Sequence, residues 1–350
     1  MYAIRQKKFH EHVILFRSFS YTHMKKQITI LSAALLLLLS IAACHHQTDT
    51  SQMEREDALQ LLDAKIKKDS DNPDLYYQRG QVLIELGREK GQQQYFKDAI
   101  LDIREAIKLR DDQCDYYTAL ADAQYSLGQM GSSYQSLQQA LKLDENNLNA
   151  HLKMGEIAYV SKNYQRALES LNKVTQQDNS NQKALMMKGC IYKEQGDTTN
   201  AVLAFRRLIE LYPEYEPAYE ELGLLYSQRG NKLGLEYLNT ALQLQPENIN
   251  VLYALGRIYQ DVEDAEKANE YYVRILEIDP NYKYAWYNRG WMELILYEDY
   301  NNAADFFSKA IECDSDYAEA YYNLGLAYQQ LKQDKQASLA FEKAHLLGYK

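Results

Sequence analysis

The stretch YAWYNRGW at residues 284–291 returns as EAYYNLGL at residues 319–326. From the second letter on, both octets read alanine, aromatic, tyrosine, asparagine, a long side chain and glycine, with Gly290 and Gly325 35 residues apart. Glycine inside a helix costs stability, and it is used where another backbone or ring must approach closely. The repetition therefore predicts two copies of one closely packed unit, with further copies elsewhere in the chain.

The same register continues through most of the sequence. The other small residues that share it are Gly80, Ala121, Gly155, Gly189, Gly223 and Gly256. The successive intervals up to Gly325 are 41, 34, 34, 34, 33, 34 and 35 residues. A period of about 34 residues is typical of paired antiparallel helices that bury their apolar faces only against neighbouring pairs. The low content of glycine (15) and proline (5) in 350 residues agrees with a helical chain.

The repeated letters resemble the tetratricopeptide repeat, whose pattern is aromatic-x₂-Leu-Gly-x₂-Tyr, then Ala-x₃-Phe, then Pro. In the last repeat these positions hold Tyr321, Leu324, Gly325, Tyr328, Ala337 and Phe341. The resemblance implies an all-α fold, a right-handed α-solenoid of about eight tetratricopeptide helix-turn-helix repeats over residues 73–350. The apolar pattern in residues 54–72 indicates an amphipathic helix that caps the first repeat.

The first repeat is seven residues longer than the others, and the excess falls in LGREKGQQQYFKDA at residues 86–99. We place this excess between the two helices of the repeat. A slack polar loop is the interpretation that we favour. A loop that docks a partner is the alternative, because connecting segments often carry function.

Residues 24–44, MKKQITILSAALLLLLSIAAC, read as an export signal. Two lysines precede an apolar run that is short for a membrane-spanning helix of about 20 residues. The letters IAAC at residues 41–44 resemble the lipobox of bacterial lipoproteins. The resemblance implies that residues 24–43 are a signal peptide, that cleavage occurs before Cys44, and that Cys44 carries lipid.

The signal begins at Met24, so we interpret residues 1–23 as an upstream extension from a mis-set start. Residues 44–53 then form a short polar tether. His45 stands where lipoproteins retained in the inner membrane carry aspartate, so the resemblance implies a Gram-negative outer-membrane lipoprotein facing the periplasm. His45 and His46 have no further ligands nearby, and we interpret them as solvated rather than as a metal site.

The composition argues against several classes of function. The net charge is −10, and the first 43 residues carry a net +5, so the remainder stands at −15. An acidic body repels phosphate backbones, which argues against nucleic acid as a ligand. The chain contains no phosphate-binding loop, dinucleotide turn, nucleophile elbow or His-Glu-x-x-His. We therefore predict no enzyme activity, no cofactor and no metal.

Histidine and cysteine side chains within the repeats are the remaining candidates for chemistry. His151 takes the aromatic position of its repeat, so we interpret it as a packed residue. Cys114, Cys190 and Cys313 belong to repeats two, four and seven, which are too far apart for a disulfide. We expect free thiols.

The resemblance implies that one face of each first helix lines a concave groove, and aromatic residues are richest there in repeats six to eight. The predicted partner-binding residues are Tyr253, Arg257, Tyr284, Tyr287, Asn288, Trp291, Tyr322 and Asn323. Tyr, Trp and Arg are the usual anchors of protein interfaces. We expect both asparagine amides to project into the groove and bind a peptide backbone, with Arg257 as the only cation. The alternative is that the tyrosines only pack edge to edge.

These features predict a membrane-anchored, non-enzymatic scaffold that binds a protein or peptide partner in a cell-envelope assembly. The alternative is a glycan or peptidoglycan binding module, since stacked aromatic side chains also suit sugar faces. The last helix reads AFEKAHLLGYK at residues 340–350, with apolar side chains and no polar cap after it. We therefore expect self-association or partner docking at the C-terminal end, which a strictly monomeric protein at high concentration would contradict.

Overall fold

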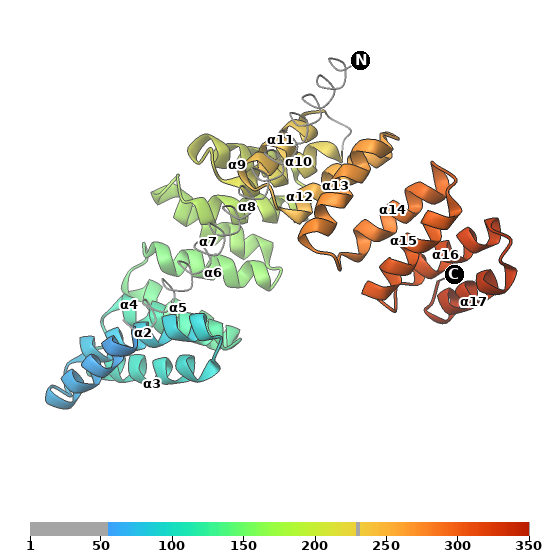
Figure 1. The fold of residues 1–350 in the computed structure, drawn as a ribbon. Coiled ribbons are helices and arrows are strands. Elements are labelled where there is room, and N and C mark those ends of the chain that lie inside the picture. The colour runs from blue at the N-terminus through green and yellow to red at the C-terminus, as the bar shows by residue number, and fades with distance from the viewer. Residues whose placement is uncertain (1–54, 229–231, 350) are drawn as a thin grey trace, which may run out of the picture. The chain divides into compact units, whose positions relative to one another are not determined.

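The computed structural model describes residues 55–228 and 232–349 (Figure 1). In these ranges the regular structure is entirely α-helical, and none of the helices is both long enough and apolar enough to span a bilayer. The chain divides into two compact units, Met1–Ile157 and Ala158–Lys350. The predicted upstream extension, signal peptide, lipidated cysteine and tether lie outside the described residues.

Helices follow one another with short connections in both units. The first unit holds a helix over residues 55–68 and then α2 (Pro73–Lys90), α3 (Gln93–Leu109), α4 (Cys114–Ser126) and α5 (Met130–Leu143). The unit boundary falls inside α6 (Leu148–Val160). The second unit continues with α7 (Tyr164–Gln177), α8 (Gln182–Glu194), α9 (Thr198–Leu211), α10 (Glu216–Ser227), α11 (Leu233–Leu244), α12 (Ile249–Asp261), α13 (Ala265–Ile278), α14 (Lys283–Ile295), α15 (Tyr300–Cys313), α16 (Ala318–Gln330) and α17 (Asp334–Leu346). Helices α2 to α17 are eight consecutive pairs, one for each predicted repeat, so the predicted all-α repeat solenoid is confirmed.

Neighbouring helices pack on one another along each unit (Figure 1). In the first unit α2 contacts α3 and α4, and in the second unit every helix from α7 to α17 contacts the next. Small and large side chains alternate in these contacts. In α15, for example, Ala303, Phe307 and Ala310 are all fully buried. The alanines let the helices approach, and the phenylalanine fills the space between them.

The glycines of the two repeated octets lie where an aromatic ring crosses the helix. A Cβ added to Gly290 would lie 2.9 Å from Phe307 Cδ1, and one added to Gly325 would lie 2.6 Å from Phe341 Cδ1. Any side chain at either position would overlap the ring. The predicted close approach of paired helices is therefore present, and it explains the glycine at the seventh position of each octet.

The prediction of a long loop between the two helices of the first repeat is wrong. Residues 86–90 belong to α2 and residues 93–99 to α3, so only Gly91 and Gln92 connect the two helices. Helix α2 has 18 residues and α3 has 17, against 13 in α14 and 14 in α15. Most of the extra residues are good helix formers, and Gly91 ends α2 in the left-handed conformation. Neither the slack loop nor the docking loop exists.

The helix over residues 55–68 lies on the first repeat. Leu62 and Ile66 are buried, and Leu59 packs against the core formed with α2 and α3. Leu61, the neighbour of Leu62 in the predicted capping helix, is 56% exposed. An ion pair between Arg55 and Glu85 joins this helix to α2.

Helix α17 presents two leucines to solvent. Leu339 is 57% exposed and Leu346 is 73% exposed, and their spacing of seven residues places them on one side of the helix. Phe341 instead packs against Tyr322, with 5.4 Å between ring centroids. Self-association at this end of the chain stays a prediction.

Candidate functional site

Asparagine or tyrosine precedes the first helix of most repeats. The asparagines before α2, α8 and α12 accept hydrogen bonds from backbone N–H groups, as Asn248 does from Val251. Tyr282 and Tyr317 stand at the same point before α14 and α16, and their side chains cap nothing. They turn toward the preceding repeat, where Tyr282 lies 5.8 Å from Tyr253 and Tyr317 lies 5.1 Å from Tyr287, measured between ring centroids. Aromatic packing along the predicted groove replaces a cap worth about 1 kcal/mol.

Two buried asparagines link successive repeats. Asn288 on α14 is 4% exposed, and its Nδ2 donates to Tyr253 Oη at 3.3 Å. Asn323 on α16 is 9% exposed, and its Nδ2 donates to Tyr287 Oη at 2.9 Å and to the Glu319 carbonyl oxygen at 3.0 Å. We call these two pairs the Tyr–Asn rungs. We expected both amides to bind a peptide backbone, but each Nδ2 already donates a hydrogen bond within the fold. A role of Asn288 and Asn323 in partner binding stays a prediction.

The tyrosine rings of the groove contact one another. Tyr284 lies 6.1 Å from Tyr253, 5.7 Å from Tyr282 and 5.9 Å from Tyr317, between ring centroids. Burial raises the pKa of Tyr287 and of Tyr317, so both hydroxyls stay protonated at neutral pH and serve as hydrogen-bonding groups. These rings do pack edge to edge, yet 42% of Tyr284 remains exposed to solvent.

Lys283 is a second cation on this face, so the expectation that Arg257 is the only cation there is wrong. Lys283 Nζ is 5.0 Å from the centroid of the Tyr284 ring and 4.9 Å from that of Tyr317. It also forms an ion pair with Asp314. Their hydrogen bond raises the pKa of Lys283 and lowers the pKa of Asp314. The positive charge is thus partly neutralised within the fold.

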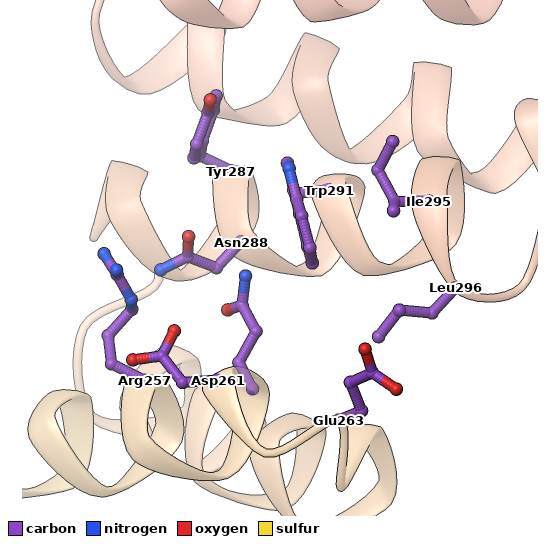
Figure 2. Close-up of a pocket in the computed structure, with 9 residues that line it drawn as sticks. Arg257, Asp261, Glu263, Tyr287, Asn288, Trp291, Ile295 and Leu296 are labelled. Carbon is purple, nitrogen blue, oxygen red and sulfur yellow. The ribbon is translucent and has the colours of Figure 1, made fainter. Parts of the chain in front are cut away.

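One pocket opens beside the rungs, between α12 and α14, with a volume of about 490 Å³ (Figure 2). From α12 and the turn after it, the lining residues are Arg257, Gln260, Asp261 and Glu263. From α14 and the residue after it, they are Tyr287, Asn288, Trp291, Ile295 and Leu296. Four of the eight predicted site residues therefore meet at one pocket. We call it the α12–α14 pocket.

The two walls of this pocket differ in chemistry. Trp291, Ile295 and Leu296 make the α14 wall largely apolar, and Ile295 is 51% exposed. Asp261 and Glu263 stand on the α12 side, across from them (Figure 2). A cavity with an apolar wall and a few convergent polar groups is the usual form of a ligand site.

The other predicted residues lie outside the pocket. Tyr253 supports it from α12 through its bond to Asn288, and Asn323 belongs to the next rung. Tyr322 stands in the last repeat, where Tyr349 stacks on it with 4.5 Å between ring centroids. Tyr253 and Asn323 join successive repeats, Tyr322 packs within the last repeat, and none of the three lines the cavity.

Three family models match this chain. The model described as the Cytochrome c-type biogenesis protein H TPR domain matches residues 76–219. The tetratricopeptide repeat model matches residues 249–282, and a TPR repeat model matches residues 297–332. The chain is a tetratricopeptide-repeat protein. The predicted repeat family is thereby confirmed.

Solved tetratricopeptide-repeat structures resemble the chain in fold. The C-terminal part of a TPR repeat-containing protein from Cytophaga hutchinsonii has a TM-score of 0.54 and 18% identity, over 66% of this chain and 93% of that one. A tetratricopeptide repeat protein from Parabacteroides merdae ATCC 43184 gives 0.53 and 18%, over 68% and 94%. Pseudomonas aeruginosa pilF gives 0.50 and 20%, over 59% and 94%. At these identities the likeness concerns the fold alone.

A curated relative shares part of the repeat region. The UDP-N-acetylglucosamine–peptide N-acetylglucosaminyltransferase of Giardia intestinalis is 29% identical over 104 residues, which are 29% of this chain and 7% of that protein. The chain thus spans a small fraction of the relative's length. The transferase activity in its name is a property of that whole protein.

The sequence analysis missed two pocket residues, Asp261 and Ile295, although the tetratricopeptide register indicates them. Counting the repeat's small residue as position 8, Arg257 and Trp291 both stand at position 9. Asp261 and Ile295 follow four residues later, one helical turn along the same face. The charged and apolar walls of the α12–α14 pocket were therefore present in the pattern. The turn residue Glu263 carried no such signal.

His151 has a structural role in its tetratricopeptide repeat. Its Nε2 lies 2.9 Å from the carbonyl oxygen of Glu145. Trp286 stands at the same position of α14, and its Nε1 donates to the Pro280 carbonyl oxygen at 2.9 Å. Both side chains join a first helix to the turn before it.

The remaining reactive groups form no evident site. Cys114, Cys190 and Cys313 are free thiols, and burial raises the pKa of Cys190 to about 11. Within residues 55–228 and 232–349, no cluster of His, Cys, Asp and Glu could hold a metal ion. The α12–α14 pocket is thus the candidate functional site.

Proposed function

We propose that this protein is a membrane-anchored, non-enzymatic scaffold. It binds an extended protein segment in the concave face of repeats six to eight and recruits that partner to a cell-envelope assembly. Stacked repeats present extended surfaces that suit such segments. The observation that carries the proposal is the α12–α14 pocket, where Trp291 and the half-exposed Ile295 line an open cavity beside the Tyr–Asn rungs.

A capture experiment on the envelope fraction tests this binding role. Ile295→Lys places an ammonium group in the apolar wall, so we expect the affinity for the captured partner to fall about tenfold or more. Leu203→Lys is the matched control, because Leu203 on α9 is 58% exposed and far along the chain from the pocket. Its capture should equal that of the wild-type protein.

The outcomes of the capture experiment separate the two functional classes. Equal capture of the same partner by all three proteins would contradict the proposed groove. Binding of purified peptidoglycan fragments by the wild-type protein, lost in Ile295→Lys and without any protein partner, would favour the glycan alternative.

Membrane attachment is the second part of the proposal, and residues 24–44 support it through their lipobox. We propose that lipid on Cys44 anchors the protein in the outer membrane, facing the periplasm. Cys44→Ala should release the protein from membranes or leave its precursor uncleaved, because the modified thiol is then missing. Membrane fractionation and mass spectrometry of the N-terminus measure this. Cys114→Ala, which changes a thiol inside the repeats, should fractionate normally, and an unmodified Cys44 in an intact, normally located chain would refute the anchor.

A further inference from the structure

Helix α17 has leucine at two exposed positions that are not both apolar in any other repeat. Phe341 is the α17 residue that crosses the glycine of its repeat, as Phe307 does in α15. Leu339 lies two residues before Phe341 and Leu346 lies five residues after it, and they are 57% and 73% exposed. At the later position the other repeats hold charged or amide side chains, among them Glu210 in α9, Glu277 in α13 and Glu312 in α15.

These leucines do not pack within the repeat to which they belong. The buried face of α17 is formed by Ala337, Ala340 and Ala344, which are 4%, 6% and 1% exposed. Leu339 follows Ala337 by two residues and Leu346 follows Ala344 by two, which is about 200° around the helix. The leucines therefore point away from α16, on which α17 packs. Their apolar surface is free to be buried against another molecule.

The charges between the two leucines are self-complementary. Glu342 and Lys343 are exposed and stand midway between Leu339 and Leu346. They follow Leu339 by three and four residues, so they lie on the same face of the helix. Neither forms an ion pair with a described residue, and Lys343 Nζ lies 5.9 Å from the centroid of the Tyr321 ring.

A second α17 in antiparallel orientation fits this pattern. With its midpoint opposite that of the first, Leu339 of each copy meets Leu346 of the other. In the same arrangement Glu342 of each copy meets Lys343 of the other. A parallel arrangement would instead bring each charged residue against its own counterpart, and like charges in contact are destabilising. The antiparallel pair covers both leucines and pairs both charges at once.

We propose that α17 is a homodimer interface, in which two copies of this chain pair their α17 helices antiparallel about a two-fold axis. The axis makes every contact occur twice, so the interface holds two leucine pairs and two Glu–Lys pairs. Interfaces below about 1,200 Å² are weak, so a dimer held by one pair of short helices is reversible. The inference depends on neither the partner groove nor the lipid anchor. A dimer carries two α12–α14 pockets, which raises the avidity for a partner with two binding segments.

The leucine contact has a matched test. Sedimentation velocity of the full chain, purified in a mild detergent, follows dimerisation over a concentration series into the high micromolar range. Leu339→Lys places an ammonium group in the apolar contact, so we expect the dissociation constant of the dimer to rise at least about tenfold. Leu203→Lys is the control, because Leu203 is 58% exposed and stands two residues before Phe205, as Leu339 does before Phe341. It should dimerise as the wild-type protein does.

The two charged residues test the antiparallel register. Glu342→Lys gives each copy two lysines and Lys343→Glu gives each copy two glutamates. Either variant alone then faces like charges across the axis, so it should dimerise at least about fivefold more weakly than the wild-type protein. A mixture of the two variants pairs a lysine with a glutamate at every contact, so the heterodimer should regain the lost affinity. A fluorescent label on one variant follows its sedimentation as the other is added.

The outcomes of these experiments are distinct. Weaker dimerisation of Leu339→Lys, normal dimerisation of Leu203→Lys and rescue in the mixed charge variants would support the interface. All four substituted residues are exposed, and circular dichroism checks that each variant keeps its helices. A wild-type protein that stays monomeric throughout the concentration series would overturn the inference. A dimer that Leu339→Lys leaves unchanged, or charge variants that do not rescue one another, would overturn it as well.

Discussion

Replacing Gly189 with leucine is expected to lower the free energy of unfolding by about 3 kcal/mol. A Cβ at this position would lie 2.4 Å from Phe205 Cε1 and 2.7 Å from Phe205 Cζ. Phe205 is fully buried, so its ring cannot move without displacing its neighbours. The added side chain must therefore push α8 and α9 apart. Urea denaturation followed by far-ultraviolet circular dichroism measures the change.

Gly131→Leu is the matched control for this change. Gly131 also lies in a helix, α5, but nothing stands within 4 Å of a Cβ added there. Leucine is the better helix former, so this variant should be neutral or slightly more stable. Similar losses in both variants, or no loss in Gly189→Leu, would show that the glycine register does not mark the close approaches.

The loss in Gly189→Leu should also be uneven along the chain. Each repeat contacts mainly its neighbours, so unfolding is governed by local stabilities and interfaces. Hydrogen exchange should therefore rise first in α8 and α9 and in the helices that touch them, α7 and α10. A uniform rise across all helices would contradict this local view.

The helical register was predictable because it depends on local steric fit. Residue 290 must be small because the Phe307 ring crosses the helix there, and the same requirement recurs as a glycine or alanine at intervals of 33 to 41 residues. The repeat-one loop was not predictable in the same way. An interval of 41 residues shows that the first repeat is longer, but the same count results from a longer loop or from longer helices. The helix-forming residues between Leu86 and Ala99 decide in favour of longer helices.

Four of the predicted residues line the candidate pocket, and its chemistry was only partly predictable. Helical periodicity placed Asn288 and Trp291 on one face correctly, because that depends on spacing within α14 alone. Whether the Asn288 amide is free depends on where the Tyr253 hydroxyl of the preceding repeat lies, and residue spacing does not give that position. Tyr282 and Tyr317 gave a usable signal, since tyrosine at an N-cap position is unusual and indicates that packing outweighs capping there.

Changing Asn288 and Asn323 together to alanine is expected to destabilise the second unit by about 2 to 4 kcal/mol. Each change removes a hydrogen bond that links two repeats, at a cost of about 1 to 2 kcal/mol. The two rungs lie in successive repeats with different partners, so their costs should nearly add. Urea denaturation of the double variant and both single variants measures this. Unchanged stability would show that the two rungs do not stabilise the fold and that both amides are available to bind a partner.

A double-mutant cycle isolates one rung and connects it to binding. Tyr287→Phe and Asn323→Ala should show a coupling energy of about 1 kcal/mol, since the two side chains bond at 2.9 Å. Tyr322→Phe is the control, because the Tyr322 hydroxyl forms no hydrogen bond with any described residue, so its loss should cost less than Tyr287→Phe. A coupling energy near zero would argue against the rung.

The same variants connect the rungs to binding. Asn288 lies on the same face of α14 as Trp291, so its hydrogen bond helps to hold the pocket in shape. Loss of this bond should therefore weaken partner binding only where it also lowers the stability. Ile295→Lys should weaken binding at unchanged stability, and this contrast separates the residues that hold the pocket's shape from those that touch its occupant.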